Sequence, residues 1–145
     1  MRIAAALTIA MTAALTAGEW KPGAQFYNAL AAVESNRQDS AVGDDGKAVG
    51  RYQIWSEYVD DVNRICALRK DARRFTDADR TDPVQSLQIV QIYLDFYGKH
   101  YTRQTGESAT AEVLARIHNG GPDGWKKEAT AAYWRKVKKQ MEIQK

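Results

Sequence analysis

A glycine-rich segment between amphipathic helical segments is the feature that most constrains how this chain folds. Its centre, Asp44-Asp45-Gly46, is typical of a tight turn. An apolar pair stands on each side of the turn, Ala41-Val42 before it and Ala48-Val49 after it. We therefore expect a short β-hairpin or a glycine-rich loop here, in which glycine recurs at positions 43, 46 and 50.

Helical periodicity occupies most of the remaining chain. Apolar residues recur every three or four positions in the segments 24–35, 56–66, 83–98, 108–117 and 129–141. Ser56 is expected to cap the second of these helices, and Asp82-Pro83 to open the third. His118–Gly124 is expected to form a rigid polar connection between the last two. The predicted fold class is therefore α+β, mainly α.

Stability has to come from a hydrophobic core, because the single cysteine, Cys66, cannot form an internal disulfide. A length of 145 residues suits one domain, which we expect to be a monomer. No cysteine and histidine spacing predicts a zinc site. The turn lacks the alternate oxygen ligands of a calcium loop, because Ala41 and Gly43 fill those places. We expect no metal and no cofactor.

The first residues are typical of a secretory signal peptide. Segment 1–17 has one positive charge, then an apolar run, then small residues. The run is short for a hydrocarbon core of ~30 Å, and the charged Glu19 and Lys21 follow directly, so no stable membrane anchor is expected. We predict a signal peptide at 1–17, a single domain at 18–145, and a secreted or periplasmic location.

The net charge of +3 favours an acidic polymer as partner, either nucleic acid or an anionic cell wall. The basic residues gather at one helix end, in segment 134–141, and form no stripe with interleaved aromatics. Nucleic-acid binding is therefore not expected.

Carboxylates are the first candidates for chemistry. Glu34 ends an apolar helical face, and Asp44 and Asp45 follow ten and eleven positions later in a turn that can fold back over that helix end. Glycosidic cleavage needs two such groups, one to protonate the leaving oxygen and one to stabilise or attack the cationic carbon. Spacing alone also allows a solvated helix-end glutamate beside an ordinary Asp-Asp-Gly turn.

Three blocks in a fixed order extend this interpretation: Val33–Asn36, Gly43–Ile54 and Ala115–Pro122. Together they resemble the lysozyme superfamily. The third block, Ala-Arg-Ile-His-Asn-Gly-Gly-Pro, followed by the segment 132–137, is similar specifically to invertebrate-type (destabilase-like) lysozymes. The similarity to soluble lytic transglycosylases is looser. The resemblance covers about residues 26–137.

The resemblance implies a lysozyme-like fold and a muramidase that cleaves the glycan strands of peptidoglycan. Glu34 would be the general acid. Asp44 would be the second carboxylate, because it stands two places before Gly46, with Asp45 as the alternate. A lytic transglycosylase, which leaves anhydro-muramic ends, and a non-catalytic wall-binding module are the alternatives on the same fold.

The resemblance also implies residues that bind the sugar. Gln53 and Asn119 would hydrogen-bond it, Ser35 would support the acid, and Gly120 would allow the backbone to approach. The cleft would be walled by aromatic rings, namely Tyr52, His118 and Tyr133. Two alternatives stay open for these rings, since Tyr133 can belong to the core and His118 can brace the Gly-Gly turn.

Two departures from the family bear on this interpretation. Invertebrate-type lysozymes are rich in disulfides, whereas this chain has one cysteine. Arg51 stands where the family usually has proline. A guanidinium there is expected to face acidic substrate or to pair with the turn aspartates.

Overall fold

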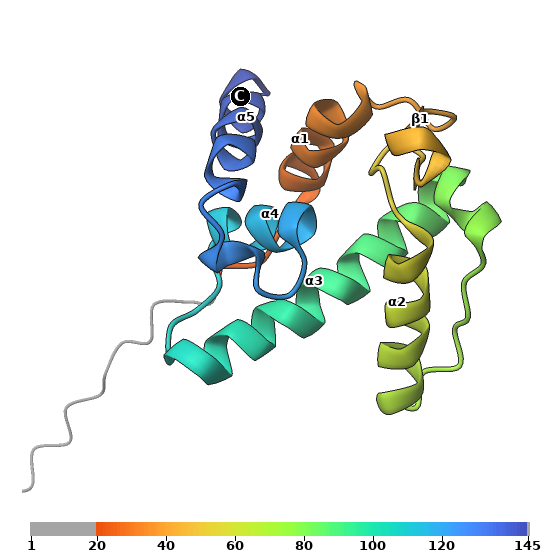
Figure 1. Ribbon diagram of the computed structural model, residues 1–145. Coiled ribbons are helices and arrows are strands. Elements are labelled where there is room, and N and C mark those ends of the chain that lie inside the picture. Colours follow the sequence, from red (N-terminus) through yellow and green to blue (C-terminus); the bar gives the residue numbers. More distant parts are fainter. Residues whose placement is uncertain (1–19, 145) are drawn as a thin grey trace, which may run out of the picture.

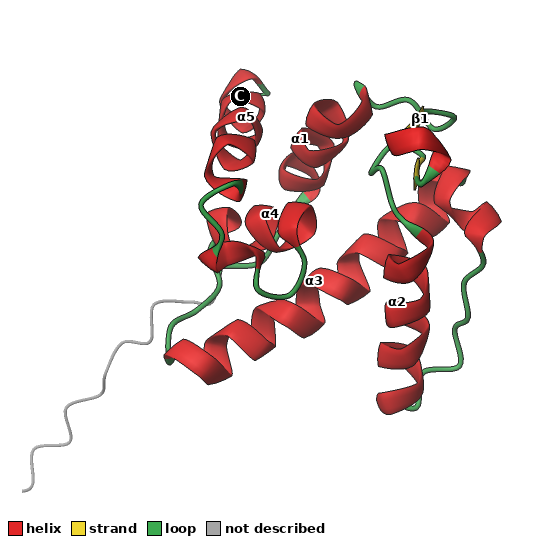
Figure 2. Cartoon of the chain, in the orientation of Figure 1, coloured by secondary structure: helices red, strands yellow, loops and turns green. Residues whose placement is uncertain are grey.

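Helices dominate the computed structural model, which describes residues 20–144 (Figure 1). The helices are α1 (Ala24–Ser35), α2 (Ser56–Leu68), α3 (Pro83–Thr105), α4 (Ala111–Gly120) and α5 (Thr130–Ile143). The strands β1 (Val42–Gly43) and β2 (Ala48–Val49) form a small antiparallel sheet, with Val42 opposite Val49. Short 3₁₀ turns are η1 (Asp44–Gly46), η2 (Asp77–Thr81) and η3 (Gly124–Lys126). The α+β, mainly α prediction is confirmed (Figure 2).

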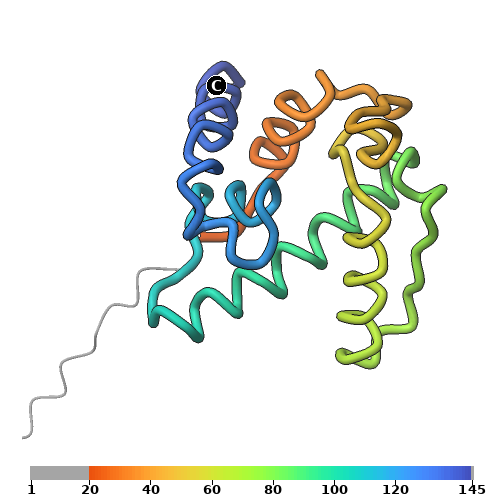
Figure 3. Tube along the Cα trace, in the orientation of Figure 1, coloured from red at the N-terminus to blue at the C-terminus, as the bar shows by residue number. Residues whose placement is uncertain are grey.

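The long helix α3 connects two groups of elements (Figure 3). On one side, α5 packs against both α1 and α4, and α4 also contacts α3. On the other side, α2 packs against α3 beside the hairpin formed by β1 and β2. The predicted signal peptide at 1–17 lies outside the described residues. Within residues 20–144, no helix combines the length and hydropathy that crossing a membrane requires.

The core is continuous and draws on every helix. Its largest fully buried side chains include Phe26 and Leu30 of α1, Ile65 of α2, Ile89 and Leu94 of α3, Ile117 of α4 and Val137 of α5. Cys66 is buried among them as a free thiol. Apolar burial of this kind is the main stabilising contribution in a domain without disulfides.

The start of α2 differs from the prediction. Trp55, not Ser56, is the N-cap residue, because its backbone is extended (φ −88°, ψ 158°) and Ser56 is already helical. The Ser56 hydroxyl donates instead to Asp77 Oδ2 at 3.0 Å. The predicted cap is therefore wrong, and Ser56 links α2 to η2.

Two further boundaries extend beyond the predicted helices. α3 continues past Gly98, because Ala109 and Leu114 pack over that glycine: a Cβ atom there would lie 3.0 Å from Leu114 Cδ2. The helix ends instead where Gly106 adopts φ 75°. α4 continues through Gly120, so the first three residues of the predicted polar connection 118–124 are helical.

Asp82 caps the long helix, and its removal should lower the free energy of unfolding. Its carboxylate accepts hydrogen bonds from the backbone N–H groups of Val84 (2.9 Å) and Gln85 (2.8 Å). Loss of such a cap typically lowers the free energy of unfolding by about 1 kcal/mol. Asp82→Ala should therefore lower the urea concentration at the unfolding midpoint. Asp60→Ala, on the exposed face of α2, is the control and should change stability by under about 0.5 kcal/mol. Equal losses in both variants would contradict the cap.

Candidate active site

One open cleft of about 830 Å³ collects chemistry-bearing side chains from α1, the hairpin, α2, α3 and α4. Of the residues predicted from the sequence, those that line it are Glu34, Asp44, Gln53, His118 and Asn119. Aromatic rings of Trp55, Tyr58, Tyr93 and Tyr97 form much of the remaining wall. A wall of aromatic rings with a few converging polar groups is typical of a ligand site.

Glu34 lies in the last turn of α1, which ends where Asn36 adopts a left-handed conformation (φ 54°). Its side chain is mostly buried, at 17% exposure. Glu34 Oε1 lies 3.5 Å from Nε2 of His118, although the two residues are 84 positions apart. The fold therefore brings the end of α4 beside the end of α1.

His118 is buried at the end of α4, where three elements meet its ring. Its Nε2 lies 3.2 Å from the carbonyl oxygen of Tyr52. Its Nδ1 lies 3.2 Å from the hydroxyl of Tyr58 on α2. The imidazole thus touches Glu34 and both tyrosines, which places it in the cleft and also in the structural framework.

The turn presents its two aspartates differently. Asp44 and Asp45 both adopt left-handed backbone conformations, with φ of 49° and 54°. Both side chains are exposed, yet only Asp44 of the two lines the cleft. Of the two aspartates, Asp44 therefore shares the cleft with Glu34 and Asp45 does not.

Tyr133 and Tyr52 lie behind the cleft wall, and neither lines it. Tyr133 of α5 is buried, and its hydroxyl has no hydrogen-bond partner within residues 20–144. Burial, and next the nearby Glu34 carboxylate, raises the pKa of Tyr133 well above 10. Tyr52 is a core residue whose backbone carbonyl oxygen faces His118 Nε2 and whose ring meets the His118 ring edge to face, with centroids 6.5 Å apart.

Gln53 is held by the hairpin in a left-handed conformation (φ 50°). Its amide nitrogen donates to the carbonyl oxygens of Gly50 (2.9 Å) and Ala41 (3.3 Å). Both N–H donors are therefore engaged, and the acceptor Oε1 packs over Gly43, where a Cβ atom would approach it to 2.4 Å. Gln53 offers the cleft an acceptor rather than a donor.

Ser35 and Arg51 stabilise the junction between α1 and the hairpin. The Ser35 hydroxyl donates to the carbonyl oxygen of Arg51 at 2.9 Å and accepts from the backbone of Gln38 at 3.0 Å. The Arg51 guanidinium binds both carboxylate oxygens of Asp39, at 2.6 and 3.2 Å. The expected pairing of Arg51 with the turn aspartates is therefore wrong, because Asp39 in the loop after α1 holds the guanidinium.

Gly120 serves helix packing. A Cβ atom there would lie 2.6 Å from Thr130 Cγ2 at the start of α5, and the Gly120 carbonyl accepts from Lys127 Nζ at 2.6 Å. The neighbouring Gly121, at φ 85°, lines the cleft instead. Close backbone approach in this region is therefore a property of Gly121.

Sequence reasoning missed the α2 and α3 walls. Glu57, Tyr58 and Asp61 share one face of α2, and Tyr93 and Tyr97 share one face of α3. Their spacing in the sequence predicts that they share a helix face. It does not indicate whether that face lines a cleft or packs into the core. The Tyr97 hydroxyl donates to Asp61 Oδ2 and accepts from Arg64 Nη2 at 3.3 Å, so Asp61 already has partners.

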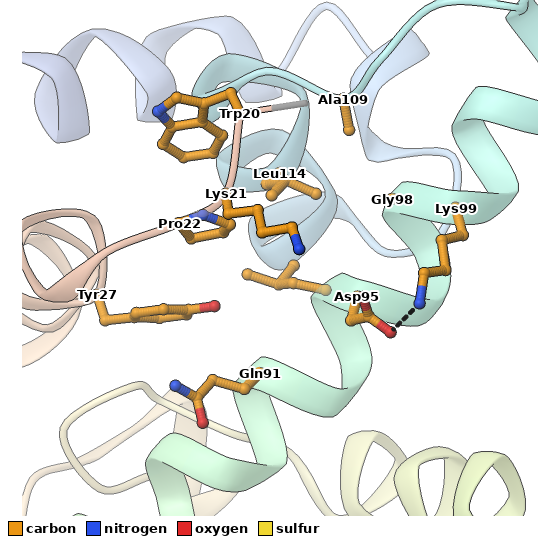
Figure 4. A pocket seen from close by; sticks show the side chains of 11 residues that line it. Trp20, Lys21, Pro22, Tyr27, Gln91, Asp95, Gly98, Lys99, Ala109 and Leu114 are labelled. Carbon is orange, nitrogen blue, oxygen red and sulfur yellow. Dashed lines mark hydrogen bonds and ion pairs between the residues drawn. The ribbon is translucent and has the colours of Figure 1, made fainter. Parts of the chain in front are cut away.

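A second hollow of about 350 Å³ lies at another face of α3 (Figure 4). Trp20, Tyr27 and Leu114 line it, and none of the predicted site residues does. The carboxylate in this hollow, Asp95, forms ion pairs with Lys99 (3.0 Å) and with Arg69, the C-cap residue of α2 (2.8 Å). The first cleft is therefore the candidate active site.

Among residues 20–144, no cluster of three or more metal-ligating side chains is present.

Comparisons with known proteins agree with the sequence blocks. Residues 24–140 match the Destabilase family. Invertebrate-type lysozyme 6 of Caenorhabditis elegans is 49% identical over 92 residues, which cover 61% of this chain and 64% of that protein. The lysozyme of Ostrea edulis is 46% identical over 98 residues, which cover 66% of this chain and 64% of that protein. The chain thus spans under two thirds of the length of these relatives.

A solved structure has a similar fold. It is the crystal structure of Aeromonas hydrophila PliI in complex with Meretrix lusoria lysozyme, where the match has a TM-score of 0.64 and 25% identity. The match covers 81% of this chain and 88% of that chain.

The Arg51–Asp39 pair can be tested against a pair with Asp44 by double-mutant cycles. Arg51→Gln and Asp39→Asn should each destabilise the fold and show a coupling of about 0.5–1 kcal/mol, because the bidentate pair is partly exposed. Arg51→Gln combined with Asp44→Asn should show no coupling. Urea unfolding of the single and double variants measures both values, and coupling to Asp44 alone would contradict the observed partner.

Proposed function

Because the chain belongs to the Destabilase family of invertebrate-type lysozymes, as its three sequence blocks predicted, we propose that it is a muramidase cleaving the glycan strands of peptidoglycan. The observation that carries the proposal is the placement of Glu34 and Asp44, from different elements, in one cleft. The two carboxyl groups differ in environment, since Glu34 is mostly buried and Asp44 is exposed. Acid-catalysed glycoside cleavage uses that asymmetry.

In the proposed reaction, Glu34 transfers its proton to the glycosidic oxygen as the bond to the sugar carbon breaks. The ionised Asp44 stabilises or attacks the cationic carbon. A water molecule then adds to that carbon, displacing the Asp44 carboxylate where it has bonded to it, and gives a proton to Glu34, so the chain is unchanged after each turnover. No cofactor takes part in these steps.

Other cleft residues are suited to hold the glycan. Asn119 is exposed beside Glu34's partner His118, and its amide can both donate to and accept from N-acetyl and hydroxyl groups. Gln53 supplies an acceptor. The exposed Trp55 offers an apolar ring face at the rim. The apolar segment 1–17 supports export, which would bring the enzyme to the wall.

Mass spectrometry of digested peptidoglycan tests the proposal directly. Reducing-end muramic acid is the expected product. Anhydro-muramic ends would instead identify a lytic transglycosylase, in which the sugar's own hydroxyl replaces water. No soluble product would identify a non-catalytic wall-binding module.

Glu34→Gln should remove nearly all lytic activity and preserve the fold. The amide keeps the shape of the side chain and lacks the transferable proton, so turnover should fall ~10²–10⁴-fold. Lysis of cell-wall suspensions measures the rate, and circular dichroism checks the fold. Activity above about a tenth of wild type would exclude Glu34 as the general acid.

Asp44→Asn should remove most activity, whereas Asp45→Asn should remove much less. The two changes are matched, because asparagine tolerates the left-handed backbone that both positions adopt. The difference therefore reports the carboxylate that lines the cleft. Unchanged turnover in both variants would contradict a paired-carboxylate hydrolase and favour the transglycosylase.

A further inference from the structure

The ring nitrogens of His118 face groups of different hydrogen-bonding character. Nε2 faces two oxygens, the Tyr52 carbonyl at 3.2 Å and Glu34 Oε1 at 3.5 Å. Nδ1 faces the Tyr58 hydroxyl at 3.2 Å. A carbonyl oxygen only accepts hydrogen bonds, whereas a phenol can donate. The surroundings therefore distinguish the two tautomers of the neutral ring.

Only one tautomer satisfies all these groups. With the proton on Nε2, the ring donates toward Tyr52 and Glu34, and Nδ1 accepts from Tyr58. With the proton on Nδ1, the Nε2 lone pair would point at a carbonyl oxygen and a carboxylate, which is repulsive. The hydrogen bond made by one ring nitrogen sets the role of the other.

Packing holds the Tyr58 hydroxyl beside Nδ1 of His118. Its ring stacks on Tyr93 with centroids 3.8 Å apart and meets the His118 ring edge to face at 5.7 Å. Burial raises the pKa of Tyr58 well above 10, with a further contribution from Tyr93, so the phenol keeps its proton at neutral pH. The hydroxyl therefore keeps a proton that it can donate to Nδ1.

We propose that Tyr58 is a positioning residue that acts through His118, fixing the Nε2–H tautomer so that the imidazole N–H faces Glu34. This proposal rests on the proposed muramidase function. When Glu34 has given up its proton, its carboxylate then meets a donor rather than a lone pair, which stabilises the charge that forms during the reaction. Tyr58 itself need not touch the glycan for this role.

The tautomer can be observed directly, because the chain contains only two histidines, His100 and His118. Nitrogen-15 spectra of histidine-labelled protein should show His118 with a protonated Nε2 and an accepting Nδ1. His100 contacts Gln104 on α3 at 2.7 Å and provides an internal reference for folding. A wild-type spectrum with the His118 proton on Nδ1 would overturn the proposal without any variant.

Tyr58→Phe removes only the donor. The His118 Nδ1 resonance should then move toward that of a free acceptor, the Nδ1–H tautomer should become populated, and turnover should fall roughly two- to tenfold, as for the loss of one hydrogen bond. Tyr101→Phe is the matched control, because it removes a buried tyrosine's hydrogen bond to Glu107 (3.2 Å) outside the cleft. It should leave the His118 spectrum and turnover unchanged.

Two results would overturn the positioning role: an unaltered His118 spectrum in Tyr58→Phe, or an altered tautomer with unchanged turnover. The spectra need no substrate, so their outcome is separate from the product analysis that tests the muramidase. A chain that shows the expected tautomer and releases no glycan would refute the proposed function alone.

Discussion

One buried imidazole joins the elements that form the cleft. His118 at the end of α4 contacts Glu34 of α1, the backbone of Tyr52 and the side chain of Tyr58 on α2. These contacts cross the molecule between the two groups of helices that α3 connects. A buried polar group is stable only where its hydrogen-bonding partners are supplied, so the positions of α1, α2 and α4 are mutually dependent. The same arrangement that satisfies the histidine places Glu34 at the cleft wall.

Close backbone approach supports this arrangement at a few glycines. Gly98 lets Leu114 and Ala109 reach α3, and Gly120 lets Thr130 of α5 reach α4. At Gly124 a Cβ atom would lie 2.0 Å from the carbonyl oxygen of Arg116. Protein interiors tolerate little added volume, so these positions keep α3, α4 and α5 at the spacing that the cleft requires. The packed core therefore substitutes for the cross-links that a single cysteine cannot form.

Four carboxylates line the cleft, and their surroundings differ: Glu34, Asp44, Glu57 and Asp61. Asp61 is bound by Tyr97 and Arg64, so its charge is already compensated. Glu57 lies in the first turn of α2, where the helix dipole stabilises a negative charge. Glu34 of α1 is mostly buried, and Asp44 of η1 is exposed. In the proposed muramidase reaction Glu34 is the acid and Asp44 its partner, and the two differ in exposure as that chemistry requires.

The sequence by itself determined the mainly helical class, the turn at Asp44-Asp45-Gly46 and the order of the three blocks, because periodicity and turn chemistry act between near neighbours. It left a hairpin and a glycine-rich loop equally open at that turn. The tertiary structure decided the rest. Arg51 pairs with Asp39 rather than with Asp44. The side-chain amide of Gln53 donates its hydrogen bonds to backbone carbonyls next to the hairpin strands. α3 passed Gly98 because another helix packs there. Tyr58 lies in the site because the face of α2 that carries it packs toward His118 of α4. Such choices depend on which groups meet across the fold, and local sequence patterns carry no information about distances between elements.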